Sequence, residues 1–88
     1  MQNYEQKVIE AIALVMEIED TSELHRDTQI ERDLGFDSGL YIELIMYLEE
    51  AIDHLHLDPA TLDIKHFESI GSIARYIDTR VTASASAL

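Results

Sequence analysis

The sequence predicts an all-α protein, a small bundle of four helices of which three are long and one is short. Apolar residues recur at the i, i+3, i+4, i+7 spacing of an amphipathic helix in three separate stretches, and no stretch alternates as a strand does. The chain has 88 residues, which is the size of one small domain, and 47% of them are apolar. That fraction is too high for a disordered protein, so the chain is expected to fold around a single core.

The first helix is predicted over about Tyr4 to Ile18, where apolar side chains share one face and most charged ones lie outside it. The apolar face consists of Val8, Ile9, Ile12, Val15 and Met16.

A long loop is predicted from Glu19 to Phe36, because this stretch is rich in turn and cap formers. Its isolated apolar residues Leu24, Ile30 and Leu34 are expected to fix it to the core. Loops of this length are uncommon in small domains unless they are functional, so we expect this one to set the direction in which the next helix begins.

The second long helix is predicted to begin at Asp37 or Ser38, because the short side-chain oxygen of either residue can cap a helix. It is expected to end near His54 to Leu57, ahead of Pro59, since proline cannot continue a helix. Its core-facing stripe consists of Tyr41, Leu44, Ile45, Leu48, Ile52 and Leu55.

A second side of this helix mixes apolar and acidic residues. At about 100° per residue it carries Ser38, Ile42, Met46, Glu49, Glu50 and Asp53. Two apolar side chains there have no core to bury them. A mixed face of this kind suits docking to a basic and partly apolar groove on a partner.

After Asp58, which can act as a cap, residues 59–64 are predicted to form a short third helix. The last helix is predicted to begin at Ser69, with Ile70, Ile73, Ala74, Ile77 and Val81 at helical spacing. The remaining segment 82–88 is low in complexity and is expected to be a disordered tail, which leaves residues 1–81 as the domain.

The charge is strongly acidic, with 6 basic and 18 acidic side chains and a formal net charge of −12. Between Glu31 and Asp53 the chain has acids with only Arg32 to oppose them. This balance excludes nucleic acid and an anionic membrane surface as partners, because both need a positive footprint. The acids could equally form only a solvated face.

Other chemistry finds no support in the sequence. The chain has no cysteine, hence no disulfide or zinc–thiolate site. His54 and His56 lie two residues apart and diverge on a helix, so no metal site is expected. No nucleophile elbow, glycine-rich phosphate loop or calcium loop is present, and we expect the protein not to be an enzyme. No signal peptide or apolar span is evident, which predicts a cytoplasmic protein.

The segment from Asp33 to Glu50 resembles the prosthetic-group site of acyl carrier proteins. It reads Asp-Leu-Gly-Phe-Asp-Ser-Gly-Leu-Tyr-Ile-Glu-Leu-Ile-Met-Tyr-Leu-Glu-Glu, and the family pattern is Asp-Leu-Gly-x-Asp-Ser-Leu before an acidic helix. Residues 67–77 are similar to the closing helix of these proteins, so the resemblance spans roughly Val8 to Ile77. It implies that Ser38, next to Asp37, carries 4′-phosphopantetheine.

The resemblance has one departure. The family usually places leucine directly after the modified serine and an acidic or polar residue next, whereas this chain reads Ser38-Gly39-Leu40. The spacing from Ser38 to the later family positions is kept, so the leucine has moved by about 100° around the helix. Gly39 costs roughly 0.5–1 kcal/mol of helix stability relative to alanine.

By this resemblance the chain is a monomeric carrier that holds acyl or aminoacyl groups as thioesters on phosphopantetheine. Its expected partners are a phosphopantetheinyl transferase, a loading enzyme and downstream biosynthetic enzymes with basic docking patches. The residues expected to meet them are Gly39, Leu40, Ile42, Glu43, Met46, Glu49, Glu50 and Asp53.

The pathway and one different function stay open. The departure at Gly39 and Leu40, with Tyr41 and Tyr47, favours polyketide or nonribosomal peptide biosynthesis over a housekeeping fatty-acid carrier. The alternative function is an acidic helical docking module in which Ser38 serves only as a helix cap.

Overall fold

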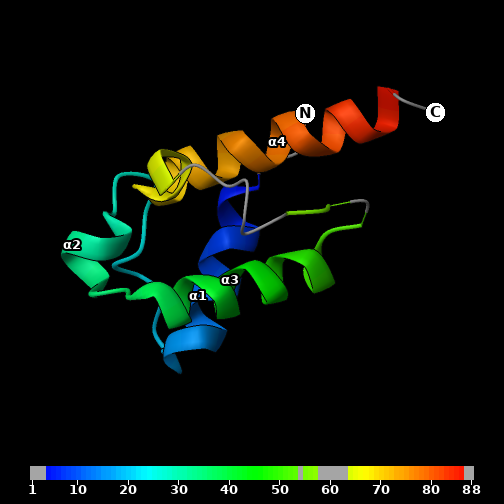
Figure 1. The fold of residues 1–88 in the computed structure, drawn as a ribbon. Coiled ribbons are helices and arrows are strands. Elements are labelled where there is room, and N and C mark those ends of the chain that lie inside the picture. The colour runs from blue at the N-terminus through cyan, green and yellow to red at the C-terminus, as the bar shows by residue number, and fades with distance from the viewer. Residues whose placement is uncertain (1–3, 54, 58–63, 87–88) are drawn as a thin grey trace.

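A computed structural model describes residues 4–53, 55–57 and 64–86 of the chain. Its elements are α1 (Glu5–Met16), α2 (Ile30–Leu34), α3 (Ser38–Ala51), the 3₁₀ helix η1 (Ile64–Phe67) and α4 (Ile70–Ser86). In Figure 1, α3 and α4 lie one above the other, and α1 crosses them steeply and packs against both. The described residues contain no strand beyond one isolated bridge, so the all-α fold class is confirmed.

The core lies where α1, α3 and α4 meet. Its largest fully buried side chains are Val8, Ile12, Ile30, Leu44, Leu48, Ile70, Ile73 and Ile77. All of them except Ile30 come from the three long helices, and at helical spacing each helix contributes one apolar stripe. These stripes agree with the core-facing residues that the sequence indicates, but five of those residues are only partly buried against the core: Ile9, Val15, Met16, Tyr41 and Val81.

The predicted loop from Glu19 to Phe36 contains a helix that the sequence analysis did not predict. Helix α2 has only five residues and ends at Gly35, which is left-handed with φ 70° and donates its N–H to the carbonyl oxygen of Glu31. Such a glycine ends a helix without the strain that a side chain would bring. Ile30 is fully buried and Phe36 is 5% exposed, so both ends of α2 are attached to the core.

Short backbone pairing joins the segment before α2 to the start of α4. The N–H of Ile30 donates to the carbonyl of Glu68 at 2.9 Å, and the N–H of Ile70 donates to the carbonyl of Thr28 at 3.1 Å. The N–H of Gly71 donates to the carbonyl of Arg26 at 2.8 Å. These bonds fix the position of α2, and therefore the place where the chain enters α3.

Helix α3 ends earlier than predicted, at Ala51 rather than near His54 to Leu57. Ile52 is already extended, and Ile52, Leu55 and Leu57 are each no more than 6% exposed. Continued as a helix, the chain would turn Leu57 about 140° away from Ile52 and out of the core stripe. Leaving the helix buries all three side chains, and that burial outweighs further helical hydrogen bonds.

The remaining boundaries differ by small amounts. Helix α1 ends at Met16, and Ser69 immediately precedes α4 rather than belonging to it. Helix α4 continues to Ser86, so residues 82–86 are helical where a disordered tail was predicted; the alanines there have the highest helix propensity. The predicted short helix at 59–64 lies outside the described residues except for Ile64, which begins η1. The division of the chain at residue 81 stays a prediction.

Candidate functional site

Asp37, rather than Ser38, caps α3. Its backbone is extended, with φ −113° and ψ −179°, and its Oδ1 accepts a hydrogen bond from the N–H of Leu40 at 2.9 Å. Its carbonyl accepts from the N–H of Tyr41 at 3.0 Å, which begins the helical hydrogen bonding. This is the geometry of an N-cap residue, whose side chain occupies a backbone donor that the first turn leaves unpaired.

Ser38 is therefore the first residue of the helix, and its hydroxyl is not used to cap it. The residue is exposed, and within the described part of the chain its Oγ takes part in no hydrogen bond. The neighbouring Gly39 is exposed as well and adds no side chain that could cover it. The hydroxyl thus stands open to solvent at the beginning of α3, within reach of an enzyme that approaches this end of the bundle.

The surroundings of Ser38 fit a phosphodiester on that oxygen. The first N–H groups of a helix lack intrahelical acceptors, and the helix dipole favours negative charge there by roughly 0.3–1 kcal/mol at an exposed site. Asp37 occupies the N–H of Leu40, while Ser38 and Gly39 contribute the two N–H groups that precede it. An anion bonded to Ser38 would sit beside these donors.

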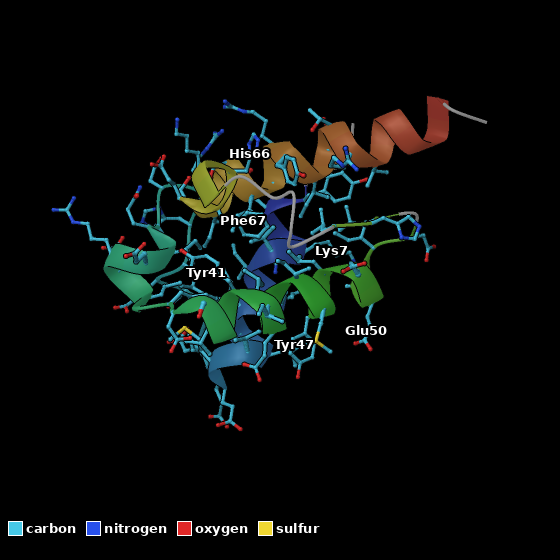
Figure 2. The ribbon with its side chains drawn as sticks, in the orientation of Figure 1. Lys7, Tyr41, Tyr47, Glu50, His66 and Phe67 are labelled. Atoms are coloured by element: carbon cyan, nitrogen blue, oxygen red, sulfur yellow. The ribbon has the colours of Figure 1, made fainter. Side chains whose placement is uncertain are left out.

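A row of aromatic rings holds the start of α3 against the start of α4. Tyr41 contacts Phe36 edge-on, with ring centroids 5.4 Å apart, and contacts Phe67 at 6.2 Å. Phe67 contacts Tyr76 at 6.3 Å, and His66 stacks on Tyr76 at 4.4 Å. Figure 2 shows Tyr41 on α3 below the segment that carries His66 and Phe67. Such ring pairs add about 0.5–1.5 kcal/mol each beyond burial, so they keep this end of α3 in place.

The core stripe predicted from the sequence includes Tyr41, but the row itself was not predicted, because its members come from α3, η1, α4 and the loop before α3. Burial raises the pKa of the Tyr41 hydroxyl above its usual value, and the nearby negative charge of Glu31 raises it further. The hydroxyl therefore stays protonated at neutral pH.

An open pocket of about 320 Å³ lies between α2, α3 and η1. Its lining is polar and aromatic and consists of Gln29, Glu31, Arg32, Tyr41, Lys65, Phe67 and Glu68. This pocket is open rather than enclosed. It offers a surface on which a group could rest but no shielded chamber for chemistry.

The mixed face of α3 is exposed as expected at its apolar positions. Ile42 is 50% exposed and Met46 is 61% exposed, although both belong to the helix that supplies much of the core. Of the acids predicted to meet partners, Glu43 and Glu50 are exposed on α3, and Asp53 is exposed two residues beyond the end of that helix.

The other residues predicted to meet partners differ in exposure. Gly39 is exposed beside Ser38, whereas Glu49 is only half-buried. Leu40 is also half-buried and packs against the core, so little of it is available to a partner. The structure therefore brings Ser38, Gly39, Ile42, Glu43 and Met46 to the surface of one helix.

Metal binding and membrane insertion gain no support from the part of the chain that is described. No cluster of three or more histidine and acidic side chains there could hold a metal ion, and His56 is exposed while His54 lies outside the described residues. No helix among these residues has the length and apolar character needed to cross a bilayer.

Comparison with protein families matches residues 6–77 to the family described as the phosphopantetheine attachment site. Comparison with curated proteins and with solved structures gives no significant match. The matched range contains all of α1 except Glu5, then α2, α3, η1 and the first part of α4, and therefore the whole of the site built above. The chain belongs to the phosphopantetheine attachment family, whose domains carry 4′-phosphopantetheine covalently.

Proposed function

We propose that Ser38 is the residue to which 4′-phosphopantetheine is attached, and that the chain carries acyl or aminoacyl groups between biosynthetic enzymes. The observation that carries this proposal is that the cap of α3 and the exposed serine hydroxyl belong to two different residues. Asp37 caps the helix, and the exposed Ser38 hydroxyl makes no hydrogen bond within the described part of the chain. A serine needed only as a cap would accept a backbone N–H, and here that bond goes to Asp37.

The protein's own residues present the attachment point and do not activate it. No described side chain hydrogen-bonds Ser38 Oγ and could take its proton, so the general base must come from the transferase. Once attached, the group supplies a terminal thiol that can hold an acyl or aminoacyl group as a thioester. Asp37 keeps the first turn ordered, and Gly39 leaves the approach to Ser38 open. This supports a carrier that is not itself an enzyme.

Partner enzymes are proposed to bind the mixed face of α3. Its exposed apolar side chains, Ile42 and Met46, lie among acids, and a basic patch with an apolar centre would complement them. The net charge of −12 speeds encounter with basic partners and supports interfaces that exchange quickly. The proposed contact residues remain Gly39, Leu40, Ile42, Glu43, Met46, Glu49, Glu50 and Asp53.

The finer assignment is a discrete carrier of polyketide or nonribosomal peptide biosynthesis, acting as a cytoplasmic monomer. Two features support this assignment: the half-buried Leu40, which stands where the family usually has an acidic or polar residue, and the aromatic Tyr41 beside the open pocket. A housekeeping fatty-acid carrier is the neighbouring alternative, and loading with acyl, malonyl or aminoacyl groups separates these pathways.

The other alternative is an acidic docking module that uses the same face of α3 without modification. The exposure of Ile42 and Met46 favours docking whether or not Ser38 is modified. In that case Ser38→Ala would leave every function of the protein unchanged.

Mass spectrometry of the intact protein, after incubation with coenzyme A and a broad-specificity phosphopantetheinyl transferase, tests the proposal. One phosphopantetheine increment is expected on the unchanged protein and none on Ser38→Ala. Ser22→Ala is a matched control, because Ser22 is also an exposed serine, and its backbone N–H and hydroxyl both hydrogen-bond Asp20 far from the start of α3 in the sequence. No increment with several transferases, or an increment on Ser38→Ala, would contradict the proposal.

A further inference from the structure

A second surface lies between α1 and α3, on the side of α3 that is opposite Ser38. An open groove of about 470 Å³ is lined by Lys7, Glu10, Ala11, Ala13, Leu14, Ile18, Glu19, Thr21, Tyr47 and Ala51. Tyr47 follows Ser38 by nine positions, which rotates it by about 180° around the helix. In Figure 2, Tyr47 extends from the face of α3 that is turned away from α4. The groove therefore lies outside the site proposed for the prosthetic group.

The groove has exposed apolar walls from two different helices. Leu14 of α1 is 61% exposed and Tyr47 of α3 is 37% exposed. Single exposed apolar residues are ordinary on protein surfaces, but neighbouring ones that line one groove mark an interaction site. The small residues Ala13 and Ala51 line the same groove and would let another backbone approach closely. None of these side chains is needed for the core that α1 and α3 form through Val8, Ile12 and Leu44.

The charges around the groove favour a basic occupant. Glu10 and Glu19 line it, Glu17 lies exposed at the end of α1, and the single basic residue of the lining is Lys7. The carbonyl end of α1 adds the negative end of a helix dipole beside Glu17 and Glu19. A second copy of this chain is a poor occupant because each copy carries a net charge of −12. A basic partner is complementary.

The shape of the groove indicates a helix. The lining of α1 extends from Lys7 to beyond its end, and ten residues of helix span about 15 Å. About three turns of a partner helix fit this length, with apolar side chains at i, i+3, i+4 and i+7 toward Leu14 and Tyr47. Basic side chains on its flanks would meet the acids at the rim.

We propose that the groove between α1 and α3 binds an amphipathic helix of a partner protein, with leucine-like side chains on one face and lysine or arginine on its flanks. A partner held there leaves Ser38 uncovered, because Ser38 and Tyr47 are about 180° apart around α3. The protein could then stay attached to one partner while enzymes act in turn at Ser38. This binding does not require modification of Ser38, so its test is independent of the proposed function.

The test uses a synthetic helical peptide of about 14 residues, with leucine and alanine on one face and lysine on the other. Binding is followed by amide chemical shifts of the ¹⁵N-labelled protein at about 0.15 M salt, where surface charge is screened beyond about 8 Å. The expected shifts centre on α1 and on Tyr47 and Ala51. A scrambled peptide of the same composition, which keeps the charge and loses the apolar face, should bind at least tenfold more weakly.

Two exposed residues provide a matched pair of variants. Leu14 lines the groove and Met46 lies on the mixed face, and each is 61% exposed. Leu14→Ser should weaken peptide binding at least tenfold, while Met46→Ser should change it less than twofold. Ala51→Gln, which narrows the groove without adding charge, should also weaken binding. All three variants should retain the helical circular dichroism of the unchanged protein, and Leu14→Ser and Ala51→Gln should also retain its Ser38 loading.

Several outcomes would overturn this inference. They are no binding of the peptide, equal binding of the scrambled peptide, shifts centred on Ile42 and Met46, or equal losses in Leu14→Ser and Met46→Ser. Concentration-dependent dimers that Leu14→Ser abolishes would assign the groove to a second copy of the chain instead.

Discussion

Two helices of this protein have a serine at their start, and the two serines are used in different ways. At the start of α4, the hydroxyl oxygen of Ser69 accepts the N–H of Ser72 at 3.1 Å, and the Ser72 hydroxyl oxygen accepts the N–H of Ser69 at 2.9 Å. This reciprocal pair is a capping box built from two serines. At the start of α3, Asp37 provides the cap and Ser38 follows it with an unoccupied hydroxyl.

The difference shows how a helix start becomes a modification site. A serine that caps a helix has its oxygen turned toward the backbone, as Ser69 does. Moving the cap one residue earlier, to Asp37, keeps the helix start and releases the next hydroxyl to solvent. The family's acidic or polar residue two positions after the serine would stand where Ser72 stands in α4 and could complete a capping box. Leu40 occupies that position here and packs against the core instead.

Exchanging each of the two serines for alanine gives the largest expected contrast. Ser38→Ala should abolish loading by the transferase and change the free energy of unfolding by less than about 0.5 kcal/mol, as for an ordinary surface substitution. Ser69→Ala should load normally and lose about 1 kcal/mol, because it removes a cap. Intact mass and urea denaturation measure the two effects. A loss of stability in Ser38→Ala equal to that in Ser69→Ala would show that Ser38 is also a cap.

Charge reversal on α3 and on α4 should show whether the loading rate depends on charges of the mixed face or only on the net charge of the protein. Glu50→Lys lies on the mixed face of α3, and Asp78→Lys lies on the exposed side of α4 with the same change in net charge. We expect about a tenfold fall in the loading rate for Glu50→Lys at low salt and less than about twofold for Asp78→Lys. The loading rates are measured by mass spectrometry over time. Equal rates for the two variants would show that the mixed face does not guide the transferase.

Replacing the cap of α3 should weaken the helix start and slow loading together. Asp37→Ala is expected to cost about 1 kcal/mol of unfolding free energy, because the N–H of Leu40 loses its acceptor. Asp37→Asn keeps a capping oxygen and should retain nearly all of that stability. Urea denaturation and loading rates of both variants test this. If Asp37→Asn keeps full stability but loads as slowly as Asp37→Ala, the carboxylate acts on the transferase rather than through the cap.

The second residue of α3 and the second residue of α4 are both glycines, Gly39 and Gly71. Replacing each by alanine should change the free energy of unfolding in opposite directions. A Cβ on Gly39 would meet only Asp37 Oδ1 at 3.5 Å, an ordinary contact, whereas one on Gly71 would meet the carbonyl oxygen of Arg26 at 3.0 Å. We expect Gly39→Ala to raise the free energy of unfolding by about 0.5 kcal/mol and Gly71→Ala to lower it by about 1 kcal/mol. Denaturation curves decide this. If Gly71→Ala stabilises the protein, the backbone at Arg26 can shift at little cost to make room for the added Cβ.

The smallest expected effect concerns the tyrosine that follows the start of α3. Burial raises the pKa of Tyr41 in the folded protein above its usual value near 10, so the folded state holds this proton more tightly than the unfolded state. The resulting stability is fully present below pH 10 and is lost as the pH rises through the folded pKa. Tyr41→Phe should remove the component that ionises at the highest pH in an ultraviolet titration of the tyrosines. Tyr76→Phe, which removes only the hydroxyl of the other tyrosine ring that contacts Phe67, should leave it in place.

The long helices could be predicted because their apolar spacing is regular over several turns. Helix α2 could not, because five residues are too few for a period to be counted, and its place depends on the buried Ile30 and its bond to Glu68. The sequence did contain one signal for it, the glycine at position 35 after Leu34, which is typical of a helix end.

The site was predicted in part for the same kind of reason. Asp37 and Ser38 are equally good caps by residue type, and only backbone geometry decides between them. The aromatic row and the groove between α1 and α3 required contacts between helices that no local pattern contains. Leu14 and Tyr47 in particular are ordinary surface positions until the crossing of α1 and α3 places them along one groove.

The most direct measurement is fragmentation mass spectrometry of the protein loaded in vitro with phosphopantetheine, with the position of the group read from the peptide that contains the start of α3. The account predicts that the group is on Ser38 and that Ser69, whose hydroxyl is held in the capping pair, carries none. A group on Ser69 or on any other serine, or an unmodified Ser38 in protein that has gained the mass, would contradict it.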